Sequence, residues 1–229
     1  MGAGNIKTTQ PLAVLAEFKR LYPSPHHYVR FGSPFQLLVA TILSAQCTDE
    51  KVNEVTGALF KRYRAPEDFA GEAIEALEEA VRPTGFYRNK AKAIQGASRA
   101  LIERFGGRVP DTMEALLTLP GIARKSANAI LQHGFGKVEG VIVDTHVIRV
   151  AGRLGWTTNT EPEKIERDLM KLFVRKEWRW LPFYLKNHGR AVCKAPTPKC
   201  SACSVAPLCP SALIEPAKKG YAPRQRRAR

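Results

Sequence analysis

Long hydrophobic runs are missing from this sequence of 229 residues. No apolar stretch approaches the roughly 20 residues needed to cross a bilayer, and the first 30 residues lack the apolar core of a signal peptide. We therefore expect a cytoplasmic protein with no membrane partner. Hydrophobic residues make up 44% of the chain and charged residues 25%, which is ordinary for a globular protein and excludes a fibre or a largely disordered chain.

Acidic residues are in short supply. The chain has 21 Asp and Glu against 36 Lys and Arg, which gives a formal net charge of +15 and a pI near 9.9. Such an excess favours a polyanionic partner, because neutralising phosphates releases condensed counterions. An anionic membrane is the competing partner, but the sequence has no strongly basic amphipathic anchor. The simplest alternative is a basic protein with a solvated surface.

Strand signals are nearly absent. The β-branched run 141–143 is only three residues long. Apolar residues instead recur with the helical period over 74–81, 91–105 and 162–173, and residues 34–46 are apolar almost all round, which predicts a central helix. We therefore predict an all-α protein with short loops.

Cysteines are few, but four of the five stand close together. Cys47 is isolated in an apolar setting and is expected to be a small core residue. The other four have the spacing C-x6-C-x2-C-x5-C: Cys193, Cys200, Cys203 and Cys209. Disulfides do not fit a chain without an export signal, so this spacing predicts a metal site. An iron–sulfur cluster fits it better than zinc, which usually takes two C-x2-4-C pairs, but the spacing leaves both open.

A Leu-Pro-Gly turn at 119–121 joins a short helix, 113–118, to a helix that is expected to run to about Gln132. Such a turn presents backbone N–H groups at a helix N-terminus, where they bind phosphate oxygens. Lys125 follows in the first turn of the second helix, where the helix dipole disfavours a charged amine, and a neutral amine is a nucleophile. A solvated lysine that only touches a phosphate is the alternative.

Asp144 precedes a run of apolar residues with helical spacing. Aspartate is a good N-cap, so this position predicts the start of a helix. The chain between Lys125 and Asp144 is one helix and a glycine-rich turn, which could bring the carboxylate beside the amine. A carboxylate there could accept protons from the attacking amine.

At these residues the chain resembles the endonuclease III family, the bifunctional DNA glycosylases and apurinic/apyrimidinic lyases of the helix-hairpin-helix superfamily. The matching motifs stand in family order, together with the four-cysteine loop: Leu43-Ser44-Ala45-Gln46, Thr84-Gly85-Phe86-Tyr87, Leu119-Pro120-Gly121, Arg124-Lys125, Val143-Asp144-Thr145-His146 and His188-Gly189-Arg190. The resemblance implies an all-α helix-hairpin-helix glycosylase fold of two domains with a DNA-binding cleft between them.

The resemblance also implies domain boundaries. A six-helix domain covers 27–137 and contains the hairpin at about 113–132. Residues 1–26 and 138–212 form the iron–sulfur cluster domain. The basic tail 213–229 is expected to be disordered.

The resemblance implies a monomeric, nucleoid-associated enzyme of bacterial type that acts on damaged double-stranded DNA. The family excises oxidised pyrimidines such as thymine glycol. By similarity, Lys125 is the nucleophile that forms a Schiff base, Asp144 assists it, and the four cysteines hold a [4Fe–4S] cluster. Gln46 would fill the space left by the flipped nucleotide, and Phe86 would wedge against the opposite strand. The expected DNA contacts are Gln46, Thr84, Phe86, Gly121, Ala123, Arg124, Ser126, His146, Arg190 and Lys194.

Three features depart from the family pattern. Ala123 stands where a second hairpin glycine is usual, Thr84 and Phe86 differ from the common wedge residues, and the interval from Lys125 to Asp144 is one residue longer than expected. A weakly active or non-catalytic DNA-binding paralogue is therefore the alternative. A mismatch adenine glycosylase fits less well, because that enzyme lacks the lysine.

Overall fold

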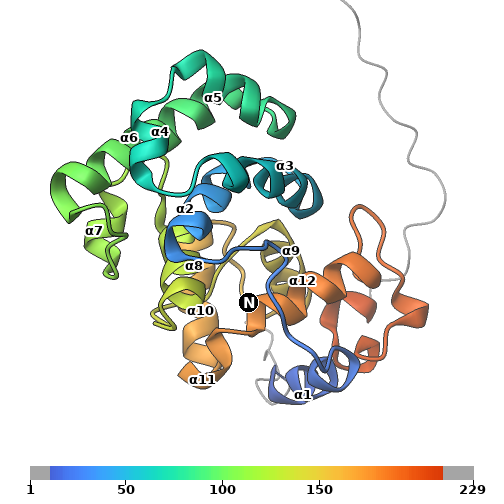
Figure 1. Ribbon diagram of the computed structural model, residues 1–229. Coiled ribbons are helices and arrows are strands. Elements are labelled where there is room, and N and C mark those ends of the chain that lie inside the picture. The colour runs from blue at the N-terminus through green and yellow to red at the C-terminus, as the bar shows by residue number, and fades with distance from the viewer. Residues whose placement is uncertain (1–10, 214–229) are drawn as a thin grey trace, which may run out of the picture. The chain divides into compact units, whose positions relative to one another are not determined.

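The computed structural model describes residues 11–213, and every regular element in this part of the chain is a helix (Figure 1). The prediction of an all-α fold is therefore confirmed, and residues 141–143 form no strand. None of the helices in residues 11–213 has the length and apolar character to span a membrane. The expected disorder of the basic tail concerns residues beyond Leu213 and lies outside the described residues.

The described chain divides into two compact units. Unit 2 consists of Ser24–Val143 together with the short segment Val174–Phe183, and unit 1 is the remainder. The segment 174–183 thus groups with the six-helix part, although the resemblance placed it in the C-terminal part. The domain boundaries drawn from the resemblance stay a prediction.

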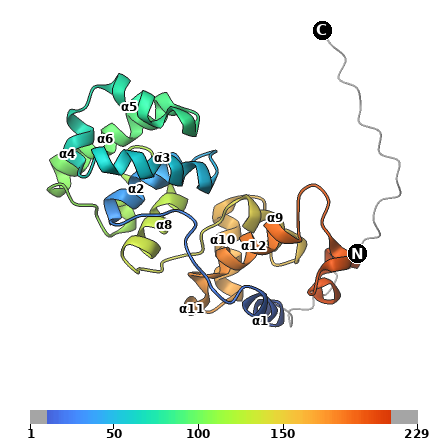
Figure 2. The same ribbon diagram turned by 45° about the vertical axis from the view of Figure 1, so that its right-hand side comes forward.

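Unit 2 is built around one central apolar helix. Its helices are α2 (Pro34–Leu43), α3 (Asp49–Arg62), α4 (Pro66–Gly71), α5 (Ile74–Val81), η1 (Arg82–Thr84), α6 (Tyr87–Phe105), α7 (Met113–Leu117), α8 (Arg124–Gly134) and α11 (Arg175–Trp178). Helix α2 packs against α3, α6 and α8, and α6 also packs against α4 and α5 (Figures 1 and 2). Seven of the ten residues of α2 are buried, as its all-round apolar sequence predicts.

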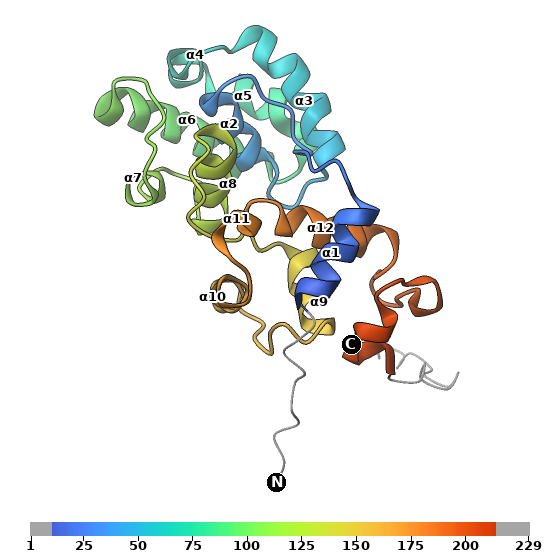
Figure 3. The ribbon, with the colours of Figure 1, turned by 90° about the horizontal axis from the view of Figure 1, so that it is seen from below.

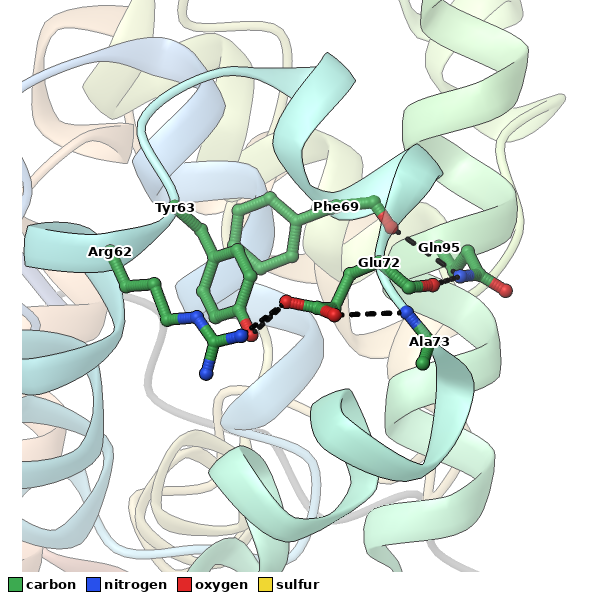
Figure 4. A network of polar contacts seen from close by, with 6 residues as sticks. All are labelled: Arg62, Tyr63, Phe69, Glu72, Ala73 and Gln95. Carbon is green, nitrogen blue, oxygen red and sulfur yellow. Dashed lines mark hydrogen bonds and ion pairs between the residues drawn. The ribbon is translucent and has the colours of Figure 1, made fainter.

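Polar contacts link α3, the turn after α4, and α6 in unit 2 (Figure 4). The hydroxyl of Tyr63 donates to Glu72 Oε2 at 2.9 Å, and Arg62 donates to the same oxygen at 2.6 Å. From α6, Gln95 donates to the main-chain carbonyl of Glu72 at 2.8 Å. These bonds hold the turn between α4 and α5 against the middle of α6.

Unit 1 contains the N-terminal helix and most of the C-terminal half. Its elements are α1 (Pro11–Leu21), α9 (Thr145–Arg153), α10 (Pro162–Leu172), most of α12 (Leu181–Ala191), η2 (Cys200–Ala202), η3 (Ala206–Leu208) and η4 (Pro210–Leu213). Helix α1 lies beside α12 (Figure 3), where the ring of Phe18 lies 4.6 Å from that of His188. Gly189 brings α12 close to α9, because a Cβ there would lie 2.9 Å from His146 Nδ1.

The predicted central helix 34–46 is shorter than expected. It ends at Leu43, and Ser44 only caps it. The reason is Gln46, whose φ of 51° cannot continue a right-handed helix. Cys47 consequently lies in a turn rather than in a helix, where it is half-buried and packs against the edge of the unit 2 core.

Candidate functional site

The Leu-Pro-Gly hairpin is held in place by its own apolar residues. Leu119 and Ile122 are buried, 3% and 7% exposed, so the turn is part of the unit 2 core. Between them, Gly121 has a φ of +77°, and a Cβ at this position would lie 2.8 Å from the Cβ of Ala93 on α6. Glycine is required here both by the backbone angle and by the close packing.

Helix α8 begins directly after the hairpin, as predicted. Its N-cap is Ala123, with φ −100° and ψ 171° and no side-chain capping bond. This is ordinary extended backbone, so alanine in place of a second glycine introduces no backbone strain. The first N–H groups of a helix have no partners within it, so this end of α8 suits an anion. Lys125 lies in this first turn and is exposed, while Ser126 is half-buried.

Two residues of unit 2 share an unusual backbone angle. Gln46 has a φ of 51° and Phe86 a φ of 50°, and they are the only non-glycine residues with positive φ in the described part of the chain. Both residues are exposed, and Phe86 is 63% exposed although it is a large hydrophobic residue. A bulky residue in the left-handed region costs on the order of 1–2 kcal/mol, and such strain concentrates at functional positions.

Thr84 differs from the other expected DNA contacts because it is buried. Its side chain is 2% exposed, and Oγ1 donates to the carbonyl of Val81 at 2.8 Å. Its own carbonyl accepts a hydrogen bond from Lys90, a buried lysine that our sequence analysis did not single out. The sequence indicates only the burial of Lys90, which shares the helical face of Ile94, Ala97 and Leu101, and gives no sign of the carbonyls that it binds.

In unit 1, Asp144 is the N-cap of α9, as predicted. Its Oδ1 accepts hydrogen bonds from the backbone N–H groups of His146 and Val147, both at 2.9 Å. These bonds fix the carboxylate at the start of the helix and leave its second oxygen available for chemistry. Lys125 belongs to unit 2 and Asp144 to unit 1.

A group of basic side chains surrounds His146. Burial lowers the pKa of His146, and the positive charges of Arg149, Arg190 and Lys186 act in the same direction against the attraction of Asp144. Arg149 Nη2 lies 3.1 Å from His146 Nδ1. Since arginine only donates, Nδ1 is the acceptor and Nε2 carries the proton of the neutral ring.

Two further expected DNA contacts lie at the surface of unit 1. Arg190 is exposed near the end of α12, and Lys194 is exposed at the start of the cysteine loop. Both come after His188 and Gly189, which are buried between α12 and its neighbours in unit 1. The two basic residues therefore lie where the chain leaves this packed region.

The four predicted metal ligands line one cavity of about 720 Å³ in unit 1: Cys193, Cys200, Cys203 and Cys209. None of the four is part of a disulfide. Within residues 11–213, no three His, Cys, Asp or Glu side chains are arranged to hold a single ion. Zinc needs four sulfurs at about 2.3 Å from one point. A four-iron cluster takes one thiolate at each iron and therefore suits thiols spread around a cavity.

The surroundings of the thiols fit a cationic metal group. Burial raises the pKa of both Cys203 and Cys209, so these thiols favour the neutral form until a positive group compensates. Arg153 also lines the cavity, where its Nη1 donates to the carbonyl of Lys194 at 2.8 Å and lies 3.4 Å from Cys193 Sγ. The sequence analysis did not identify Arg153, since nothing in the motif spacing marks it.

Comparison with known proteins gives a consistent result. Residues 39–175 match the family model of HhH-GPD superfamily base excision DNA repair proteins. The chain is 52% identical over 206 residues to endonuclease III of Synechocystis sp., a match that covers 90% of this chain and 94% of that protein. It is 41% identical to endonuclease III of Bacillus subtilis over 192 residues, with 82% and 86% covered.

Solved structures agree with these relatives. The structure of a non-covalent endonuclease III–DNA complex superposes with a TM-score of 0.86 at 39% identity, covering 90% of this chain and 97% of that one. A trapped endonuclease III–DNA covalent intermediate gives the same values. A thermostable thymine-DNA glycosylase shares the fold at 22% identity and a TM-score of 0.77. With the hairpin, the capped aspartate and the four-cysteine cavity in place, this chain belongs to the endonuclease III family.

Proposed function

We propose that this chain removes oxidised pyrimidines such as thymine glycol from duplex DNA and then cuts the strand, with Lys125 as the nucleophile. Membership of the endonuclease III family makes it a base-excision-repair enzyme, a DNA glycosylase and lyase. The observation that most directly supports the proposed nucleophile is the position of Lys125 in the first turn of α8, directly after the Leu-Pro-Gly hairpin. A single copy of the chain is expected to act, at the nucleoid.

DNA binding begins with phosphates. The hairpin at Gly121 and Ala123 leads into the N-terminus of α8, where the backbone N–H groups and the Ser126 hydroxyl suit a phosphate oxygen. In unit 1, the exposed Arg190 and Lys194 would bind phosphates of the same duplex. With +15 net charge, affinity for undamaged duplex is expected to fall steeply between roughly 50 and 200 mM salt.

The damaged nucleotide then leaves the helix. Gln46 and Phe86 are exposed and strained, and both belong to unit 2. We assign Gln46 to the space that the flipped nucleotide leaves and Phe86 to the opposite strand. An oxidised pyrimidine that has lost aromaticity stacks poorly, which reduces an extrusion cost of a few kcal/mol. Since the side chain of Thr84 is buried, its part in this step is its carbonyl, as a support for Phe86.

The chemistry follows from one amine and one carboxylate. The lone pair of Lys125 Nζ attacks C1′, and the bond from C1′ to the base breaks with its electron pair going to the base. Asp144 accepts a proton from the attacking amine and stabilises the positive sugar that develops. The C1′–O4′ bond then breaks, with its electron pair and a proton going to O4′, so the sugar ring opens and C1′ and Lys125 are joined as a Schiff base. The Schiff base acidifies C2′, so loss of a proton from C2′ breaks the C3′–O bond and expels the 3′-phosphate by β-elimination. Water then releases Lys125.

The four cysteines fit a [4Fe–4S] cluster, and we assign it to them. Bound there, the cluster would cross-link the loop 193–209, and four thiolate ligands leave no open coordination position for substrate chemistry. Its role in this proposal is to order the surface on which Lys194 and Arg190 lie.

Borohydride reduction tests the proposal, because it traps a Schiff base as a stable adduct. The wild-type protein is expected to form a covalent adduct with duplex DNA that contains thymine glycol or an abasic site. Lys125→Ala should form no adduct while it still binds DNA, and Lys92→Ala, an exposed lysine on α6, should form as much adduct as the wild type. Wild-type binding without an adduct would leave a non-catalytic DNA-binding protein.

A further inference from the structure

Lys90 is a buried lysine in the first turn of α6, and only 4% of it is exposed. Its Nζ donates to two main-chain carbonyls, those of Leu43 and Thr84, each at 2.8 Å. In the part of the chain that the structure describes, no carboxylate pairs with it. Burial lowers the pKa of Lys90. A buried cation without an acidic partner is costly, so an apolar residue would be the better choice if packing were its only role.

The two carbonyls belong to the two strained turns. Leu43 ends α2, three residues before Gln46, and Thr84 ends η1, two residues before Phe86. The backbone N–H of Lys90 also donates to the carbonyl of Phe86, at 3.1 Å. A single side chain and its own backbone therefore hold both turns, which are about 40 residues apart in the sequence and otherwise belong to different helices.

We propose that Lys90 is a positioning residue that fixes Gln46 and Phe86 relative to each other, so that the two side chains enter the duplex as one unit. This inference rests on the proposed function, in which Gln46 fills the space left by the flipped nucleotide and Phe86 wedges against the opposite strand. With its three donors, an ammonium can hold carbonyls from two directions, whereas an apolar side chain would leave both unpaired and the turns independent.

The positioning role affects extrusion and not the sugar chemistry. A thymine glycol must be pushed out of the duplex, while an abasic sugar carries no base to extrude. Loss of the Lys90 bonds should therefore slow the reaction with thymine glycol and spare the reaction with an abasic site. A residue that merely stabilises unit 2 would affect both substrates alike.

The test uses single-turnover kinetics with the full-length protein on two duplexes, one with thymine glycol and one with an abasic site. Lys90→Met keeps the volume and removes the donors, and Lys92→Met removes an exposed lysine from the same helix as the control. We expect Lys90→Met to lose about tenfold or more on thymine glycol, since two hydrogen bonds from a charged group are lost, and less than about threefold on the abasic site. A 2-aminopurine opposite the lesion should show less unstacking.

A second measurement asks whether Lys90 acts through the two turns. In a Gln46→Ala, Phe86→Ala background, Lys90→Met should add less than about twofold, because the side chains that it positions are gone. If Lys90→Met does not fold, Lys90→Gln, whose shorter amide can reach one carbonyl at most, replaces it under the same criteria.

Equal losses on both substrates, equal losses in both backgrounds, or kinetics of Lys90→Met that match those of Lys92→Met would overturn the positioning role. These results differ from a failure of the proposed function. If the wild type forms no borohydride adduct with either duplex, the proposed function fails and the role of Lys90 fails with it. If the wild type forms the adduct and Lys90→Met is unimpaired, only the positioning role is lost.

Discussion

The hairpin of unit 2 and the cysteine loop of unit 1 are both irregular segments, but different forces order them. The hairpin buries Leu119 and Ile122 in an apolar core that extends over most of unit 2. In the loop 193–212, Val205 is the only residue in the buried class among the side chains that the structure describes. The loop is held instead by hydrogen bonds to its main-chain carbonyls, such as those from Arg153. In the proposed function, the cluster bound by its four thiols holds it as well.

This difference predicts how each segment fails. A segment ordered by packing should be sensitive to shape, because a misplaced methyl group disturbs a close-packed core. A segment ordered by a bound metal group should be sensitive to its ligands and insensitive to moderate changes of shape. The first two predictions below test this contrast, and the other two compare further interactions within unit 2, from the largest expected effect to the smallest.

The largest effect is expected at the cysteine loop. Cys203→Ser should lose iron and leave the loop unfolded, because little apolar burial remains to order it. Lys194 and Lys199 are exposed in this loop, so trypsin should cleave there at least about tenfold faster than in the wild type. Cys47→Ser is the matched control, since Cys47 does not line the cavity. Equal trypsin resistance of wild type and Cys203→Ser would contradict this account of the loop.

The next effect is expected at the hairpin. Gly121→Ala forces a positive φ and places a methyl group 2.8 Å from Ala93 Cβ. We expect it to lower the free energy of unfolding by about 2–4 kcal/mol, from strain and overpacking together. Gly136→Ala has a similar φ of +70° and no neighbouring atom within 4 Å, so it should lose only about 1 kcal/mol. Denaturant titration of both variants separates the two contributions, and equal losses would remove the packing argument.

A third effect is expected from a buried histidine of unit 2. Burial, with smaller contributions from His27 and Arg179, lowers the pKa of His133 from 6.5 to about 3. The His27 ring lies 3.7 Å away, and Nδ1 of His133 is buried without a hydrogen-bond partner. The unfolded chain protonates His133 more readily than the folded protein does. The contribution of neutral His133 to the free energy of unfolding is therefore present above pH 6.5 and is lost as the pH falls from 6.5 towards 3.

The size of this loss is measurable. At pH 5 the free energy of unfolding should be lower by up to about 2 kcal/mol because of His133. His133→Phe keeps a ring and removes the titration, so its free energy of unfolding should depend less on pH over this interval. A pH profile identical to that of the wild type would mean that His133 does not titrate with unfolding.

The smallest effect is expected in unit 2 where α3, α4 and α6 meet. The Arg62–Glu72 ion pair measures 2.6 Å, but the Arg62 side chain is 65% exposed. Arg62→Ala should change the free energy of unfolding by less than about 1 kcal/mol, as is usual for solvated pairs. Tyr63→Phe removes the hydrogen bond of a residue that is 3% exposed, to the same carboxylate, and should cost about 1 kcal/mol. A larger loss for Arg62→Ala than for Tyr63→Phe in chemical denaturation would reverse this ranking.

The parts of the fold that the sequence predicted are those with local causes. Helical periodicity predicted α5 and α6, Asp144 marked the start of α9 by its capping chemistry, and Pro162 marked the start of α10. The Leu-Pro-Gly motif likewise predicted the turn before α8. Each of these signals acts over a few neighbouring residues.

The parts that were missed depend on contacts between distant residues. The positive φ of Gln46 and Phe86 has no marker in a sequence, because glycine or asparagine usually takes such angles. Lys90 was missed because its acceptors lie 47 and 6 residues away and are main-chain carbonyls, which any residue type could supply. Tertiary structure alone reveals that these three residues form one group.

The most direct test of the central claim is to identify the amino acid that bonds to DNA. The wild-type protein is mixed with abasic duplex, reduced with borohydride and digested, and the peptide that carries the sugar fragment is sequenced by mass spectrometry. The account predicts a single modified residue, Lys125. A modification at any other residue, or no modified peptide from protein that binds the duplex, would contradict it.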